Sequence, residues 1–436
     1  MFTTRKRSVF GGAAIIASAA LVLGACASGD NGSTGGGDPV DPTVEEVTLN
    51  FAFWGNDVRA GFYNEALDAF MDEYPNITVN STFLGFPEFW EARQIEAAGG
   101  GLPDVMQFDY SYMRQYSENG LLLDLDPYLG NIIDTSGISD EILSIGVVGG
   151  VTTGIATSTN AWGMYTNPIL AEQLGVESYP GGGSWDDYND WINEVSGQLD
   201  GHWAGTDWTG RIQNFELQLR AEGGNLFTED GQPGFDEARL LEFWQQGEAI
   251  RDGGAIPGQR LEEIAPVSGF DAALTLSELT WDNFGAGYLG NLGEEFPSIG
   301  LVAPPTHVEG SRDLYLKPSM LHTISAGTDH PEASALLVNF LVNSPEVGSI
   351  FGTNRGLPAS QLQLAGADLG ELDTQIRDYE ASIADRLGDA PPVPIVGYGS
   401  IEETFRQIGA ELGLGTITPE QAVDRFFTEM NVILNN

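Results

Sequence analysis

The folded part of the chain opens with Val47-Thr48-Leu49-Asn50-Phe51-Ala52-Phe53-Trp54. Large apolar side chains alternate here with smaller or polar ones, and this period of two predicts a β-strand. A helix is expected next, because apolar residues recur on one stripe until Pro75 ends it. A strand over 77–83, a helix over 87–98 and a strand over 104–108 follow. The order strand–helix–strand–helix–strand predicts a parallel sheet in an α/β protein.

Aromatic and polar residues follow two of these strands. Trp54 and Asn56 come at the end of the first, and Asp109 and Tyr110 come after the third. Ligands of open parallel sheets bind beyond the carboxyl ends of the strands, so we expect these four residues at one ligand-binding edge. Asp109 has a second interpretation, as the N-cap of the helix that follows it.

The rest of the chain predicts a second α/β lobe. Strand and helix signals continue on both sides of residues 154–166, which we expect to form two short extended pieces. No break in composition separates two consecutive domains, so the two lobes should share the chain by crossing between them. Alternation over 272–279 predicts a strand that leads to Trp281. Ser184 with Asp187, and Thr418 with Gln421, predict helix starts with capping boxes.

The first 26 residues have the features of an export signal. Arg5, Lys6 and Arg7 precede an apolar run over 13–23, and the run ends in Leu23-Gly24-Ala25-Cys26. The run is shorter than the roughly 20 apolar residues that a membrane-spanning helix needs. Leu23 to Cys26 resembles the lipobox of bacterial lipoproteins, which implies removal of residues 1–25 and attachment of lipid to the Cys26 sulfur. The alternative is an ordinary signal peptide with an incidental cysteine.

Residues 26–45 are rich in glycine and predict a flexible tether. Without the signal, 15 of the 18 basic residues remain against 63 acidic ones, a formal charge of −48. This charge repels nucleic acid and anionic lipid, so nucleic-acid binding is not expected. It fits a solvated acidic surface, and attraction of cationic ligands is the alternative. Lysine occurs only as Lys6 and Lys317.

Several kinds of chemistry have no support in the sequence. Residues 285–290 match the dinucleotide fingerprint formally, but Gly293 and Pro297 follow where a long helix should run. Neither lysine fits a phosphate-binding loop, and the four histidines lack the spacing of metal ligands. No cofactor or metal is therefore expected. A glycosidase stays open as the main alternative, because its two carboxylates can come from any part of the chain.

Six segments, read in order, resemble the sugar-binding branch of the extracellular solute-binding proteins of bacterial ABC importers. They are Gly101-Leu102-Pro103-Asp104-Val105, Asn119-Gly120-Leu121-Leu122, Tyr165-Thr166-Asn167, Ser184-Trp185-Asp186-Asp187, Ala272-Ala273-Leu274 leading to Trp281, and Arg355-Gly356-Leu357-Pro358.

The resemblance implies a periplasmic-binding-protein fold. It has two lobes, each a mainly parallel sheet flanked by helices, with the ligand cleft between them. One lobe would combine 46–158 with 317–358, and the other 159–316 with 359–436. The resemblance also implies a lipid-anchored, extracytoplasmic monomer that passes a sugar to the transmembrane subunits of a permease. A binding protein for a peptide or polyamine is the non-sugar alternative.

A sugar ring has an apolar face and a rim of hydroxyls, so aromatic rings and amides or carboxylates suit it. Nine tryptophans are present, although core packing is the commoner role of a tryptophan. The resemblance makes Trp281 a sugar-stacking residue. The other candidates at loop ends and helix starts are Trp54, Asn56, Asp109, Tyr110, Trp208, Gln213, Asp282, Asn283 and Tyr398. Lys317, at an expected crossing, is a weaker candidate, because a surface ion pair would also explain it.

Overall fold

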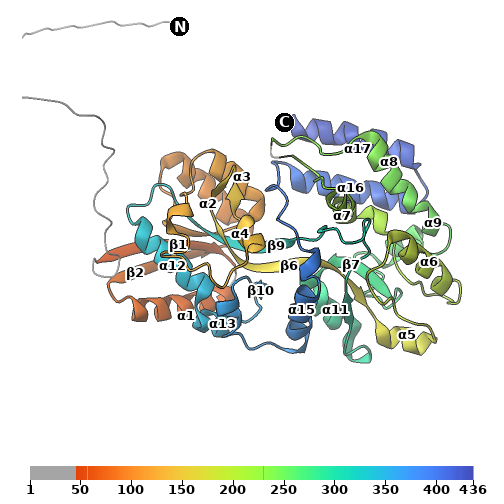
Figure 1. Ribbon diagram of the computed structural model, residues 1–436, viewed down its shortest axis with the longest axis horizontal. Helices are drawn as coiled ribbons and strands as arrows, with labels where there is room; N and C mark the ends of the chain where they lie inside the picture. Colours follow the sequence, from red (N-terminus) through yellow and green to blue (C-terminus); the bar gives the residue numbers. More distant parts are fainter. Residues whose placement is uncertain (1–45, 56, 229, 436) are drawn as a thin grey trace, which may run out of the picture. The chain divides into compact units, whose positions relative to one another are not determined.

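A computed structural model describes residues 46–55, 57–228 and 230–435, and folds them into two α/β lobes (Figure 1). The expected two-lobed fold is thereby confirmed. The export signal over 1–25, Cys26, the tether and Asn56 lie outside the described residues.

The first lobe contains the expected strand–helix–strand–helix–strand unit. Its elements are β1 (Val47–Trp54), α1 (Asp57–Glu73), β2 (Ile77–Leu84), α2 (Phe86–Gly99), β3 (Val105–Phe108), α3 (Tyr110–Glu118), η1 (Asp126–Tyr128), α4 (Asp140–Ser144), β4 (Val147–Val148), β5 (Val151–Thr152), β9 (Leu316–Ile324), α12 (Pro331–Asn343), α13 (Pro345–Phe351), β10 (Leu357–Pro358) and α14 (Gln361–Leu364). β1 pairs in parallel with β2 on one side and with β3 on the other, as the sequence predicts.

Both faces of β1 are covered over its carboxyl half. Leu49, Phe51 and Phe53 are buried on one face, and Ala52 and Trp54 are buried on the other. Phe51 and Phe53 pack against Tyr63 of α1 with ring centroids 5.0 and 4.3 Å apart. Burial on both faces is expected for a parallel sheet with helices on each side. The carboxyl end of β1 is therefore fixed in position.

β6 (Ile155–Thr166) belongs to both lobes (Figure 1). Residues 155–161 pair antiparallel with β9, and Ser158 and Thr159 pair with β10. Residues 162–166 pair antiparallel with β7 and, over the last three, with β8. The prediction of two short extended pieces was wrong: this is one strand of 12 residues, and its register shifts twice between Ala156 and Thr159.

The second lobe places helices around the far half of β6. Its elements are α5 (Pro168–Leu174), α6 (Trp185–Ser196), η2 (Trp208–Gly210), α7 (Ile212–Ala221), α8 (Glu237–Gln246), α9 (Glu248–Arg251), α10 (Gly258–Ile264), β7 (Ser277–Trp281), η3 (Asp282–Phe284), α11 (Gly285–Leu292), η4 (Gly293–Glu295), β8 (Gly300–Val302), α15 (Glu371–Ser382), η5 (Ala384–Arg386), α16 (Tyr398–Gly413) and α17 (Pro419–Leu434). β7 and β8 both run antiparallel to β6, so the prediction of a mainly parallel sheet in each lobe was wrong for the second lobe; the parallel pairs lie in the first.

Local signals fix the starts of several helices. The capping boxes predicted at Ser184 with Asp187 and at Thr418 with Gln421 are present at the starts of α6 and α17. Each box satisfies backbone N–H groups that have no partner inside the helix. In the described part of the chain, no helix is long and apolar enough to cross a membrane.

Candidate functional site

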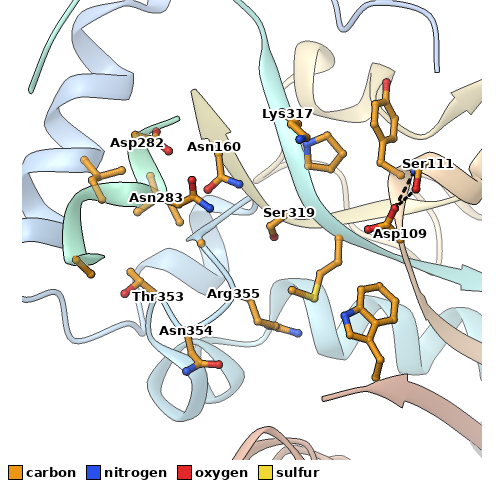
Figure 2. A pocket seen from close by; sticks show the side chains of 18 of the residues that line it. Asp109, Ser111, Asn160, Asp282, Asn283, Lys317, Ser319, Thr353, Asn354 and Arg355 are labelled. Atoms are coloured by element: carbon orange, nitrogen blue, oxygen red, sulfur yellow. Dashed lines mark hydrogen bonds between the residues drawn. The ribbon is translucent and has the colours of Figure 1, made fainter. Parts of the chain in front are cut away.

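The main cleft lies where the two lobes and their crossing strands meet, and its volume is about 710 Å³. Figure 2 shows Asp109 and Ser111 on one side of this pocket, Asn160, Asp282 and Asn283 on the other, and Lys317, Ser319 and Arg355 between them. The first group comes from the start of α3, and the second from β6 and η3. The cleft is thus lined by both lobes and by the strands that join them.

A side cavity of about 50 Å³ adjoins the main cleft. Tyr110, Lys317, Pro394, Tyr398 and Glu402 line both spaces. The side cavity alone is lined by Gln213, Glu216, Trp281 and Tyr315, among others. A group bound in the main cleft therefore has a small polar and aromatic recess beside it.

The first lobe presents Trp54, Asp109 and Tyr110 to the main cleft, so three of its four candidates are brought together. Trp54 is only 9% exposed, and its ring packs edge-on against Phe86 at 5.4 Å. Asp109 accepts a hydrogen bond from the Ser111 backbone N–H at 2.9 Å, so it is the N-cap of α3. The Tyr110 hydroxyl donates to the Pro391 carbonyl oxygen at 3.2 Å.

The second lobe contributes Asn283 and Tyr398 to the main cleft, and Gln213 to the side cavity. Gln213 Nε2 donates to Glu402 Oε1 at 2.6 Å. Tyr398 is the first residue of α16. Burial, together with the nearby carboxylates of Glu216 and Glu402, holds the pKa of Tyr398 well above its usual value. Its hydroxyl is therefore a stable hydrogen-bond donor at neutral pH.

Trp281 lies at the end of β7 and lines the side cavity. Its ring meets Trp162 and Tyr315 edge-on, at 5.2 and 5.9 Å between centroids. The Lys317 ammonium lies 5.0 Å from the Trp281 centroid, over the ring. This geometry is a cation–π contact, so Trp281 positions the lysine beside the cleft.

Trp208 is not brought to either space. It is 1% exposed, stacks on Trp185 at 4.1 Å, and donates from Nε1 to Asn189 Oδ1 at 2.8 Å. An indole with a buried partner for its N–H is typical of a core residue.

Polar residues that the sequence did not single out as candidates also line the main cleft. They are Arg59, Ser111, Asn160, Ser319, Thr353, Asn354, Asp373 and Glu402. Arg355, which lines it too, had a signal in the Arg355-Gly356-Leu357-Pro358 motif, but only as a crossing point. The others come from separate elements, and no local pattern marks them.

Comparison with known proteins gives the class of this chain. The profile of the bacterial extracellular solute-binding protein family matches residues 55–347. A family 1 extracellular solute-binding protein from Alicyclobacillus acidocaldarius is similar at 28% identity, with a TM-score of 0.78, over 90% of this chain and 99% of that one.

Two further solved structures share the fold. One is described as a de novo designed esterase improved by directed evolution; it has 19% identity and a TM-score of 0.76, over 89% of this chain and 98% of that one. A periplasmic oligogalacturonide binding protein from Yersinia enterocolitica has 21% identity and a TM-score of 0.74, over 89% and 99%.

The chain belongs to the bacterial extracellular solute-binding protein family, because the family profile covers more than half of it. Proteins of this family bind solutes and are not defined by catalysis, and they work outside the cytoplasm.

Proposed function

We propose that this chain captures an oligosaccharide in the main cleft and delivers it to the transmembrane subunits of an ABC importer. The main cleft itself carries the proposal. Trp54, Tyr110 and Tyr398 supply ring surfaces, while Asn160 and Asn283 supply amide groups from β6 and η3. A pyranose needs both kinds of contact, and the volume falls within the roughly 300–1,000 Å³ usual for small-molecule sites.

The similarity to a binding protein for oligogalacturonide supports this ligand class. The ordered motifs that resemble the sugar-binding branch also support a sugar ligand. One of these motifs leads to Trp281, which lines the side cavity. Of the remaining candidates, Asp109 lines the main cleft and Gln213 lines the side cavity.

Delivery requires that the lobes close on the ligand. We propose that the chain divides into 46–158 with 317–358 and 159–316 with 359–436. The contacts of α14 with α12 and α13 move the last boundary of this division from residue 358 to just after residue 364. Because β6, β9 and β10 are hydrogen-bonded side by side, closure would bend these strands together.

We also propose that the protein is a monomer and that it works at the cell surface. Processing at the lipobox would leave Cys26 as the first residue, with acyl chains that hold it to the membrane and residues 26–45 as the tether. This part of the proposal rests on the sequence, since the segment lies outside the described residues.

We propose no enzymatic activity. This part of the proposal rests on the family, whose proteins bind solutes. The esterase that shares the fold is a designed protein, and fold alone does not carry its activity to this chain.

A thermal-shift screen tests the proposal. Neutral and acidic mono- and oligosaccharides, short peptides and spermidine are added to purified residues 46–436, and binders are measured by calorimetry. A ligand at 100 times its Kd stabilises by about 2.7 kcal/mol, which gives a clear rise in Tm. We expect a sugar to give the largest rise and no new reducing ends to form. Binding of only peptides or spermidine, or turnover of the bound sugar, would contradict the proposal.

A further inference from the structure

Two basic side chains of the main cleft are unusual for this protein. Most arginines of the described chain form ion pairs with carboxylates, as expected where acids outnumber bases so strongly. Lys317 and Arg355 line the cleft and form no ion pair within the described residues. Leaving a charge without a partner in a partly dehydrated site is costly unless a ligand compensates it.

Arg355 is almost completely buried, with 4% of its surface exposed. Its guanidinium stacks on Phe351, 3.8 Å from the ring centroid, and donates from Nη1 to the Tyr63 hydroxyl at 3.4 Å. Both partners are uncharged, so they hold the guanidinium in place without neutralising it. Arg59 supplies a second guanidinium to the cleft. Burial lowers the pKa of Arg59, and the nearby charge of Arg355 lowers it further.

Lys317 is held in a similar way. Its ammonium lies over the Trp281 ring, and no hydrogen-bond acceptor for it occurs among the described residues. An ammonium carries three donors, so all three stay available to a ligand. Lys317 sits opposite Asn160 in the pairing of β9 with β6, at the boundary between the main cleft and the side cavity.

The acids of the cleft are already engaged with the protein. Asp109 caps α3, and Asp282 Oδ2 accepts from the Ala161 N–H at 2.9 Å. Asp373 Oδ1 accepts from Thr353 Oγ1 at 2.8 Å, and Glu402 accepts from Gln213. These acids therefore have oxygens already occupied by protein donors, whereas the Lys317 ammonium has no protein acceptor within the described residues.

We infer that Lys317 and Arg355 select an acidic sugar, with carboxylates of uronic-acid rings bound by these two side chains. The inference rests on the proposed function and narrows its ligand class. A carboxylate carries a single charge, so one carboxylate can pair with Lys317 and another with Arg355. Charge-assisted hydrogen bonds of this kind are about twice as strong as neutral ones.

The experiment compares each acidic sugar with its own methyl ester, which keeps the rings and removes the charge. The probes are digalacturonate, a glucuronate-containing disaccharide and a mannuronate dimer, measured by calorimetry. We expect at least one acid to bind ten or more times tighter than its ester. Lys317→Met should remove most of that preference and leave the ester within about twofold, whereas Lys317→Arg should restore it. Arg355→Lys, which keeps the charge but shortens the reach, should weaken the acid alone.

Arg260→Gln is the matched control, because it removes a positive charge from the surface of α10, outside the cleft. It should leave the preference unchanged. If neutral sugars bind and no acid outcompetes its ester, or if Lys317→Met weakens acid and ester equally, the inference is overturned while sugar binding stands. If no sugar binds at all, the proposed function fails instead.

Discussion

Asp282 and Glu380 form a buried carboxyl pair beside β6, in which Asp282 contributes to the raised pKa of Glu380. Asp282 Oδ1 and Glu380 Oε1 are both buried and have no hydrogen-bond partner within the described residues. Desolvation and mutual repulsion oppose ionisation of both groups, so the pair holds a proton at neutral pH. Burial raises the pKa of Asp282 to about 7, and burial together with Asp282 raises that of Glu380 well above its usual value.

This pair should make stability depend on pH. Unfolded carboxyl groups lose their protons near pH 4, whereas the folded pair keeps them to about pH 7 or above. Between these values the folded state binds more protons than the unfolded state, so stability falls as pH rises. Glu380→Gln replaces the shared proton by an amide donor. We expect the Tm of this variant minus the Tm of the parent protein to increase steadily from pH 5 to pH 8.

Glu403→Gln is the control for this measurement. Arg406 and Gln407 hold the pKa of exposed Glu403 at about 2, so its removal should give a difference in Tm that is flat from pH 5 to pH 8. A flat difference for Glu380→Gln as well would show that the pair holds no proton in this range.

Two tryptophans should respond differently to substitution. Trp281→Leu removes the ring below Lys317, so we expect ligand affinity to fall at least tenfold, about 1.4 kcal/mol. Tm should also fall, because Trp162 and Tyr315 lose an aromatic neighbour. Trp208→Phe removes the hydrogen bond to Asn189 in the core, so it should lower Tm. Its ligand affinity should stay within about twofold of that of the parent protein. Calorimetry measures the affinity of both variants, and thermal melts measure their Tm. Unchanged affinity in Trp281→Leu together with weakened affinity in Trp208→Phe would contradict the site.

A buried ion pair should anchor the segment that precedes β9. Arg386 donates from Nε and Nη2 to the two oxygens of Asp313 at 3.0 and 2.7 Å, and the Asp313 side chain is 1% exposed. Arg386→Met leaves a buried carboxylate without its cation, which typically costs about 3–5 kcal/mol. We expect a lower urea midpoint, partly recovered by adding Asp313→Asn. An unchanged midpoint would show that the pair contributes little.

Export and anchoring can be tested at Cys26. Cys26→Ser in the full chain should release the protein into the medium or leave the signal uncut, because the serine oxygen does not take the thioether-linked lipid. Intact mass spectrometry of the parent protein from membranes should show the mass of residues 26–436 plus acyl chains. An unmodified Cys26 in that fraction would rule out the anchor.

Much of the first lobe could be predicted because its signals are local. Alternation in β1, the apolar stripe of α1 and the length of β3 all lie within short windows, and parallel pairing then follows from the order of the elements. The same logic places Trp54 and Asp109 at neighbouring strand ends, and both line the main cleft. Their role in binding stays a prediction.

Positions that depend on distant segments could not be derived from local patterns. Trp208 is buried because Trp185 and Asn189 reach it from another helix. The strand expected over 272–279 starts only at Ser277, because Ala273 adopts a φ of 54° and Leu274 closes a turn onto the Gly269 carbonyl. Lys317 of β9 pairs with Asn160 of β6, and Trp281 of β7 pairs with Trp162 of the same strand. The contact between Lys317 and Trp281 therefore depends on three strands that are distant in the sequence.

The pairing of β3 with β9 has a consequence for biogenesis. Phe108 pairs with Leu321, so the first lobe needs a strand that is synthesised about 210 residues after its third one. Contacts of such long sequence separation form slowly, because the intervening chain must first be ordered. Neither lobe can finish folding until most of the chain has left the ribosome. For the proposed export, this slow closure would keep the chain unfolded for longer, and the first lobe would complete its sheet only after β9 has been made.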